Sequence, residues 1–299
     1  MTRRRVVAIG AAAVALAVTL TIVTLTRRQS GPVVVTFPDP KLDAAVRKAI
    51  NKPTGDIMTT DLVGVGLAEL RVCHEGIQDL SGLECCTDLT DLDLDSNALA
   101  QPGLLDRGAK RLGITLHLDP VVNLWPLKKL TNLTRLDLSA DRISDVSALS
   151  GLTNLTTLDL RYNNISDVSA LSGLTKLMKL ELSGNNISDV STLSALTNLT
   201  RLDLSSNDVS DVSPLGGLTN LRALELSFNR IPDVSPLAGL TTLKWLYVSA
   251  NQIVDVGPLV SNSGLGEGDT VLLEGNQLSP EALLRDIPAL KARGVNVRL

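Results

Sequence analysis

A segment of 22 residues that repeats along the chain constrains this sequence more than any other feature. Its clearest copy, with the first leucine of the next one, reads LTRLDLSADRISDVSALSGLTNL over residues 133–155. The first leucine returns every 22 residues, at Leu133, Leu155, Leu177, Leu199, Leu221 and Leu243. One copy alone buries too little apolar surface to fold, so copies with a fixed period must stack on one another. The repeat therefore determines the fold before the propensity of any single residue matters.

Each copy follows the pattern L-x-x-L-x-L-x-x-N-x-I-x-x-V-x-x-L, which predicts a short strand, an inward turn and a return limb. Alternate residues of a strand point to opposite faces, so Leu136 and Leu138 are expected in the core and Asp137 on the other side. Asp145 stands where a short helical turn needs an N-terminal cap. The asparagines are expected to bond buried backbone groups of neighbouring copies. They are Asn97, Asn163, Asn185, Asn207, Asn229, Asn251 and Asn276.

The pattern predicts an α/β solenoid, namely a right-handed leucine-rich-repeat horseshoe with a parallel β-sheet on its concave face and short helical or 3-10 turns on its convex face. Ten repeats are expected over residues 67–278, including a degenerate copy at Ile114, Leu116, Asp119 and Val121. Helical caps are expected at both ends, because solenoids need covered ends to remain soluble. These caps are residues 37–66, with Leu42 and Val46 on one helix face, and residues 279–299.

The first 28 residues predict a membrane segment. Arg3, Arg4 and Arg5 precede 21 uncharged, mostly apolar residues, and Arg27 and Arg28 follow them. Such a run spans a bilayer core as a helix, which favours an uncleaved signal anchor with the repeats outside the cytoplasm. Cleavage of a signal peptide, giving a secreted protein, is the alternative. Residues 29–36 are expected to form a tether.

At its leucine and asparagine positions the chain resembles the internalin-like family of bacterial 22-residue leucine-rich repeats, over about residues 37–299. The resemblance implies a module that binds other proteins on its concave face. A structural envelope or adhesion protein is an alternative function. Similar repeats form the phosphatase regulatory subunits of eukaryotes, but those are cytosolic, which the predicted anchor disfavours.

Two groups of outward-facing residues are candidates for the partner-binding surface. One is a column of acids between the paired strand leucines, formed by Asp137, Asp159, Glu181, Asp203 and Glu225. Arg135, Lys179 and Arg201, two residues before an acid, are expected to offset the repulsion between neighbouring acids. The other group is Trp245, Tyr247 and Phe228, with Tyr162 three repeats away. Aromatic side chains dominate interface hot spots, so we expect a partner with basic residues beside an apolar one.

The chemistry expected of this chain is binding and not catalysis. It has no phosphate loop, no nucleophile elbow and no zinc spacing, so neither an enzyme nor a cofactor is predicted. A column of Cys73, Asp95 and His117 is a weak metal candidate, and Cys86 is expected to be a buried core residue. Beyond the first 30 residues there are 23 basic and 32 acidic residues, a net charge of −9, which argues against nucleic acid as a partner.

Overall fold

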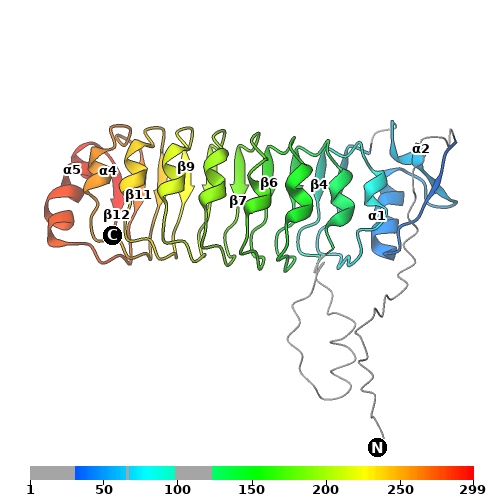
Figure 1. The fold of residues 1–299 in the computed structure, drawn as a ribbon, viewed down its shortest axis with the longest axis horizontal. Coiled ribbons are helices and arrows are strands. Elements are labelled where there is room, and N and C mark those ends of the chain that lie inside the picture. The colour runs from blue at the N-terminus through cyan, green and yellow to red at the C-terminus, as the bar shows by residue number, and fades with distance from the viewer. Residues whose placement is uncertain (1–30, 65–66, 98–122) are drawn as a thin grey trace, which may run out of the picture. The chain divides into compact units, whose positions relative to one another are not determined.

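The computed structural model describes residues 31–64, 67–97 and 123–299, and residues 33–299 form one compact unit. Its main element is a ten-stranded parallel sheet in which the strands follow one another in chain order (Figure 1). The strands are β3 (Glu69–Arg71), β4 (Asp91–Asp93), β5 (Arg135–Asp137), β6 (Thr157–Asp159), β7 (Lys179–Glu181), β8 (Arg201–Asp203), β9 (Ala223–Glu225), β10 (Trp245–Tyr247), β11 (Thr270–Leu272) and β12 (Asn296–Arg298). The predicted solenoid of leucine-rich repeats is therefore confirmed.

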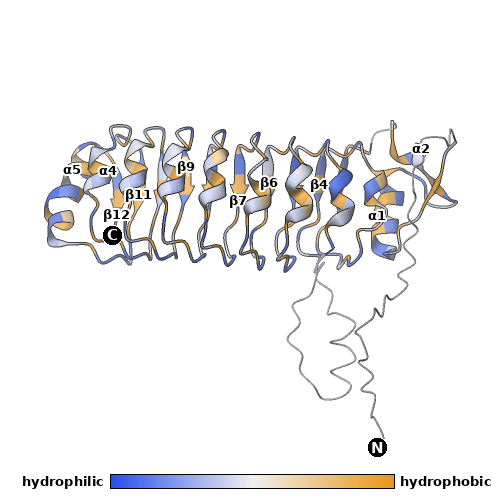
Figure 2. Cartoon of the chain, viewed as in Figure 1, coloured by the Kyte–Doolittle hydropathy of each residue, from blue (hydrophilic) through white to orange (hydrophobic). Residues whose placement is uncertain are grey.

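The strand register aligns equivalent leucines of successive repeats. Leu136 pairs with Leu158, Leu158 with Leu180 and Leu180 with Leu202, and all four side chains are fully buried. Hydrophobic residues recur in the same way in every repeat (Figure 2). One continuous core results, so each repeat is stabilised by its neighbours.

Short helical turns lie opposite the sheet and carry the return limbs. They are η1 (Leu83–Cys85), η2 (Trp125–Lys129), η3 (Ser147–Gly151), η4 (Ser169–Leu171), η5 (Ser191–Ala195), η6 (Ser213–Gly217), η7 (Ser235–Gly239) and α4 (Gly257–Ser261). As the repeat predicts, Asp145 Oδ1 accepts a hydrogen bond of 2.8 Å from the backbone N–H of Ser147. Asp167, Asp189, Asp211 and Asp233 make the same bond in the next four repeats. These carboxylates satisfy N–H groups that would have no partner inside so short a turn.

The asparagines bridge adjacent repeats as the pattern predicts. Asn185 Nδ2 donates to the carbonyl oxygens of Leu160 and Leu182, at 2.9 Å each, and its Oδ1 accepts from the N–H of Ile165 at 3.0 Å. Asn163, Asn207, Asn229 and Asn251 repeat this arrangement. In the repeat that contains β5, Asp141 occupies the asparagine position, and its Oδ1 accepts a hydrogen bond of 2.8 Å from the N–H of Asn97.

The N-terminal cap consists of β1 (Val34–Val35), α1 (Pro40–Ala49), β2 (Ile57–Met58) and α2 (Thr59–Leu62). Leu42 and Val46 of α1 are fully buried, as predicted. Asp39 caps α1 and also accepts from the N–H of Gln78 at 2.8 Å, which ties the cap to the first repeat. The tether predicted over residues 29–36 is wrong for Val34 and Val35, because these residues form β1, which pairs with β2, and Val35 is buried.

The C-terminal cap consists of a short π-helix, η8 (Ala282–Asp286), the helix α5 (Ile287–Ala292) and β12. Pro288 lies in the first turn of α5, and the backbone stays helical from η8 into α5 through Asp286 and Ile287. Gly294 has φ +86° directly after the helix, a left-handed conformation that favours glycine. After Gly294 the chain enters β12, which joins the sheet beside β11.

The degenerate repeat predicted around Ile114, Leu116, Asp119 and Val121 is wrong as a rung between β4 and β5. These residues lie outside the described ranges, but β4 pairs directly with β5, Leu92 opposite Leu136. The N–H of Leu94 donates to the carbonyl of Asp137 at 3.0 Å. No strand can therefore stand between them. The anchor predicted over residues 1–28 also lies outside the described ranges, and no helix within those ranges is long and apolar enough to cross a membrane.

Candidate partner-binding face

The side chains between the paired leucines lie on the sheet face opposite the core, which we call the open sheet face. In strand order they are Arg71, Asp93, Asp137, Asp159, Glu181, Asp203, Glu225, Tyr247, Leu272 and Arg298. Pairing in register places each beside its neighbours, so the predicted column of acids exists. The residues in this row are acidic from β4 to β9 and largely apolar at β10 and β11.

The middle of the acid column is neutralised by basic side chains of the same face. Arg161 Nε donates to both carboxylate oxygens of Asp159 at 2.9 Å each, and its Nη2 donates to Oδ2 at 2.6 Å. Glu181 is 3% exposed and pairs with Lys179 at 3.0 Å and Arg201 at 2.8 Å. Burial alone would raise the pKa of Glu181, but these two cations outweigh it and lower the pKa. Asp159 and Glu181 are thus unavailable to a partner unless these pairs open.

Acids on either side of this middle segment remain less compensated. Burial, followed by the charges of Asp159 and Asp93, raises the pKa of Asp137 despite two hydrogen bonds from Ser139. Burial and the charge of Asp203 likewise raise the pKa of Glu225, although Arg201 Nη2 lies 2.5 Å from its carboxylate. A cation brought against either group would favour its charged form.

The counter-charges were only partly predictable from the sequence. Lys179 pairs with the acid two residues after it, Glu181, whereas Arg201 pairs with Glu181 and Glu225 of the neighbouring strands and Arg135 lies 3.7 Å from Asp91. Arg161 was not predicted at all, because it follows its acid instead of preceding it. Its position two residues after Asp159, on the same face of an extended chain, could have identified it.

Trp245 and Tyr247 lie on the open sheet face of β10, as the register predicts. Trp245 is 47% exposed and stands between Ala223 and Thr270, while Tyr247 stands between Glu225 and Leu272. Ala223 and Thr270 are small, so the indole ring has room on both sides. Together, Trp245, Tyr247 and Leu272 form an apolar area next to Glu225.

Phe228 and Tyr162 lie just beyond their strands and have positive φ angles, 59° and 56°. They are 64% and 65% exposed. The left-handed conformation costs an L-residue about 1–2 kcal/mol. An exposed ring at such a position offsets little of this cost, because it buries little apolar surface. A Cβ atom at Gly184 would lie 2.7 Å from Tyr162 Cδ1, so the tyrosine ring rests directly on that glycine. Neither aromatic residue has an evident role in stabilising the core.

The predicted metal column is not assembled in the described residues. Cys73 Sγ lies 3.1 Å from Asp93 Oδ1, and burial followed by this contact raises the thiol pKa to about 12. His117 lies outside the described ranges, and Ser139 hydroxyl donates to Asp95 where the next ligand was expected. Within the residues described, no three His, Cys, Asp or Glu side chains could hold one metal ion. Cys86 is fully buried in the core, as expected.

Comparisons with known proteins agree with this architecture. A family model described as leucine-rich repeats in two copies matches residues 153–196, 175–217 and 197–239. The crystal structure of internalin C2 from Listeria monocytogenes is 34% identical over 84% of this chain and 99% of its own, with a TM-score of 0.68. Internalin InlF of the same species is 26% identical over 88% and 91%, with a TM-score of 0.54. A leucine-rich-repeat protein of Leptospira interrogans, 24% identical over 77% of this chain and 60% of its own, shares the fold with a TM-score of 0.61. No curated protein matches the chain.

Proposed function

Because the chain belongs to the internalin family of leucine-rich-repeat proteins, we propose that it binds a protein partner on the open sheet face. The partner contacts the apolar area of Trp245, Tyr247 and Leu272. The rings of Phe228 and Tyr162 complete the contact surface. The observation that carries the proposal is that three exposed aromatic side chains, Trp245, Phe228 and Tyr162, and the partly buried Tyr247 lie on or beside one face of a chain with only 2% aromatic residues.

The energetics favour Trp245 as the main anchor. A hot-spot side chain is large, ordered before binding and able to lose its remaining water. Trp245 meets these conditions, because its backbone is fixed by two neighbouring strands and about half of its surface is still open. Phe228 and Tyr162 already hold the left-handed backbone conformation in the free protein. Preorganisation of this kind reduces the entropy that binding must overcome.

The acids give the partner its expected charge. Glu225 lies beside Tyr247, Asp203 lies beside Glu225, and Asp137 lies near the other end of the column. A partner with basic residues next to an apolar one complements this order. Because Arg201 and Arg161 already neutralise the central acids, we expect charge to affect association rate and specificity more than affinity.

The second part of the proposal concerns location. Residues 1–28 form an uncleaved signal anchor, and the repeats stand outside the cytoplasm. This rests on the uncharged run from Val6 to Thr26 between arginines. A reporter fused after Leu299 should be active outside the cytoplasm and sediment with membranes. Release of a shortened soluble form would identify a cleaved signal peptide instead.

The direct test of function is capture of the partner from intact cells. The fragment 31–299 retains β1 and so the whole N-terminal cap. It should capture a protein that Trp245→Ala captures poorly. Trp125→Ala is the matched control, because Trp125 is 59% exposed but lies on η2, away from the open sheet face. Equal capture by both variants and the wild type would exclude the open sheet face. It would favour a structural envelope or adhesion role, for which other surfaces suffice.

A further inference from the structure

Two aromatic rings and a carboxylate occupy three of four neighbouring positions on the open sheet face. Trp245 and Tyr247 lie two residues apart on β10, on the same side of the strand and about 7 Å apart along it. The register of β9 places Ala223 beside Trp245 and Glu225 beside Tyr247, at the strand spacing of about 4.8 Å. A single planar group can therefore contact a ring and the carboxylate at the same time. We call Trp245, Tyr247 and Glu225 the aromatic corner.

The carboxylate of this corner has one oxygen left for a partner. Arg201 reaches Glu225 from β8 and donates to Oε1 at 2.5 Å, while its Nε donates to Glu181 at 2.8 Å. Among the described residues, no hydrogen bond reaches Glu225 Oε2. The outward side chains of β7 to β10 include two bases, Lys179 and Arg201, and three acids, Glu181, Asp203 and Glu225. The corner therefore lacks one positive charge.

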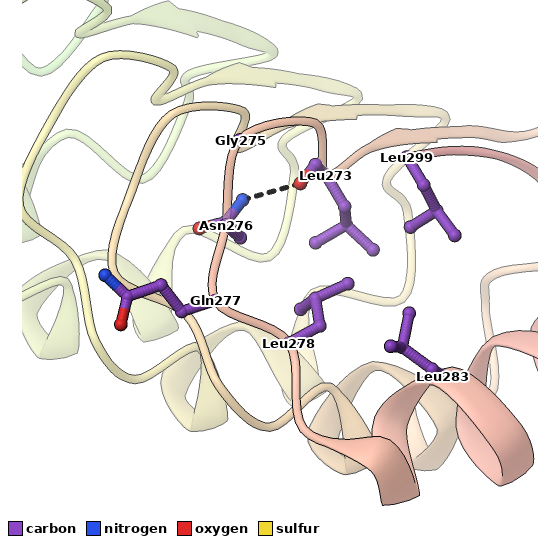
Figure 3. A pocket seen from close by; sticks show the side chains of 7 residues that line it. All are labelled: Leu273, Gly275, Asn276, Gln277, Leu278, Leu283 and Leu299. Carbon is purple, nitrogen blue, oxygen red and sulfur yellow. Dashed lines mark hydrogen bonds between the residues drawn. The ribbon is translucent and has the colours of Figure 1, made fainter.

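The neighbouring strand offers no such combination. Leu272 of β11 lies beside Tyr247 on the open sheet face. The next residue, Leu273, lines a pocket of about 390 Å³ with Leu278 and Leu283 (Figure 3). None of the residues that line this pocket is charged or aromatic. It presents neither a ring nor a carboxylate to a cation, whereas the aromatic corner presents both.

We propose that the aromatic corner receives the guanidinium group of an arginine side chain of the partner. The guanidinium lies flat against the exposed indole of Trp245, and its N–H groups donate to Glu225 Oε2. The face of an indole ring attracts a cation more strongly than that of other aromatic side chains, and a hydrogen bond from a guanidinium to a carboxylate is charge-assisted. This inference rests on the proposed function, because it names the group that the open sheet face recognises.

Arginine fits the corner better than other side chains do. A guanidinium is planar, carries N–H groups along its edge and is weakly hydrated, so it can stack on a ring and bond a carboxylate together. The ammonium of lysine is compact and strongly hydrated, so it loses more hydration in the same place. An apolar side chain would cover Glu225 Oε2 without supplying a hydrogen bond, which is costly for a charged group. An acidic side chain would be repelled by Glu225 and Asp203.

The fluorescence of Trp245 tests this assignment with a defined probe. The full-length chain with Trp125→Phe, in nonionic detergent, keeps Trp245 as its only tryptophan. At constant ionic strength, N-acetyl-arginine amide should change its emission saturably. The lysine analogue should bind more weakly, and the apolar norleucine analogue should leave the emission unchanged. An arginine probe that does not bind, or a norleucine analogue that binds as tightly, would overturn the proposal.

Matched substitutions test the carboxylate. Glu225→Gln removes the charge while Arg201 keeps its bond to Glu181, so the arginine probe should bind about three- to fivefold more weakly. Glu281→Gln makes the same change in a glutamate that also pairs with one arginine, Arg285, but lies at the C-terminal cap. It should leave the affinity unchanged. Equal weakening in both variants, each folded by circular dichroism, would show general attraction to an acidic protein and would exclude the corner.

Fluorinated tryptophan separates attraction of a cation from apolar contact. Fluorine withdraws electrons from the negative face of the indole on which a cation rests. The Trp125→Phe chain takes up the analogue at Trp245 alone. One, two and three fluorine atoms on the ring should lower the affinity for the arginine probe step by step. An affinity that stays constant or rises would mean that Trp245 acts only as an apolar surface.

This inference and the proposed function can fail separately. If a captured partner depends on Trp245 while the arginine probe does not bind, protein binding on the open sheet face stands and the recognition of arginine is wrong. If the probe binds at the corner while no captured protein depends on Trp245, the guanidinium site stands and the proposed function is wrong.

Discussion

At the scale of single residues, two positions of each repeat explain much of the structure. The asparagine supplies donors and an acceptor to backbone groups of two adjacent repeats, as Asn185 does for Leu160, Leu182 and Ile165. The residue just before it adopts a left-handed conformation in described repeats from His74 to Gly275. Both roles follow from how tightly the chain must turn after the strand. Only the first was predicted, because side-chain chemistry is visible in a sequence whereas a φ angle is not.

The asparagine role predicts a difference between two neighbouring residues. Asn185→Ala removes the partner of the buried N–H of Ile165 and one of the two amide donors to each of the carbonyls of Leu160 and Leu182, so it should lower the free energy of unfolding by about 1–3 kcal/mol. The adjacent Asn186 is exposed, and Asn186→Ala should change that free energy little. Urea unfolding followed by circular dichroism measures both. Equal losses in the two variants would contradict the assigned register.

The left-handed aromatic residues predict a gain of stability with a loss of binding. Phe228→Gly removes a ring that is 64% exposed and the left-handed penalty of about 1–2 kcal/mol. Part of this is offset by the greater freedom of glycine in the unfolded chain. The midpoint of urea unfolding should therefore stay constant or rise, while partner binding weakens. A clear fall in the midpoint would show instead that Phe228 packs as part of the fold.

At the scale of elements, the 22-residue period located nine of the ten strands correctly, and the tenth, β12, lies beyond the last predicted repeat. The same period also produced the one wrong rung. β4 and β5 are two periods apart in the sequence and pair directly. An additional 22 residues between two strands leave the later repeats on the same period, whether or not those residues form a rung of the stack. Periodicity alone cannot distinguish these cases. β1 was missed for another reason, because its two residues form a strand only by pairing with β2, 23 residues away.

The N-terminal cap predicts a particular response to acid. Burial would raise the pKa of Asp39, but backbone N–H groups of Gln78, Leu42 and Lys41 outweigh it, and the folded-state pKa is lowered. Because the folded pKa lies below the unfolded one, this carboxylate stabilises the fold at pH values above about 4. That contribution is lost as the pH falls through the folded-state pKa.

Unfolding between pH 5 and pH 2, about the range in which a carboxylate titrates, tests this linkage. Asp39→Ala should lower the free energy of unfolding at pH 7 by about 1–2 kcal/mol through loss of the cap. The variant should also lose less stability on acidification than the wild type. Asp43→Ala, on the same helix but paired only with Arg47 near the surface, should cost less than about 1 kcal/mol. Identical acid profiles for Asp39→Ala and the wild type would refute the assignment.

At the scale of the whole molecule, the sequence predicted the face and most of its residues but not its electrostatics. The positions of Trp245, Tyr247 and the acids follow from strand alternation alone. Which acids are neutralised depends on side-chain reach across strands, as when Arg201 contacts both Glu181 and Glu225.

The central claim is that the open sheet face binds the partner mainly through Trp245, and equilibrium affinity tests it most directly. With the captured partner, Trp245→Ala should weaken binding by about 2 kcal/mol or more, at least about 30-fold in Kd. Its melting temperature should stay close to that of the wild type. Trp125→Ala should leave the affinity unchanged. If Trp245→Ala instead unfolds the domain and leaves the affinity of the remaining folded molecules unchanged, Trp245 serves the fold and the open sheet face is not the binding site.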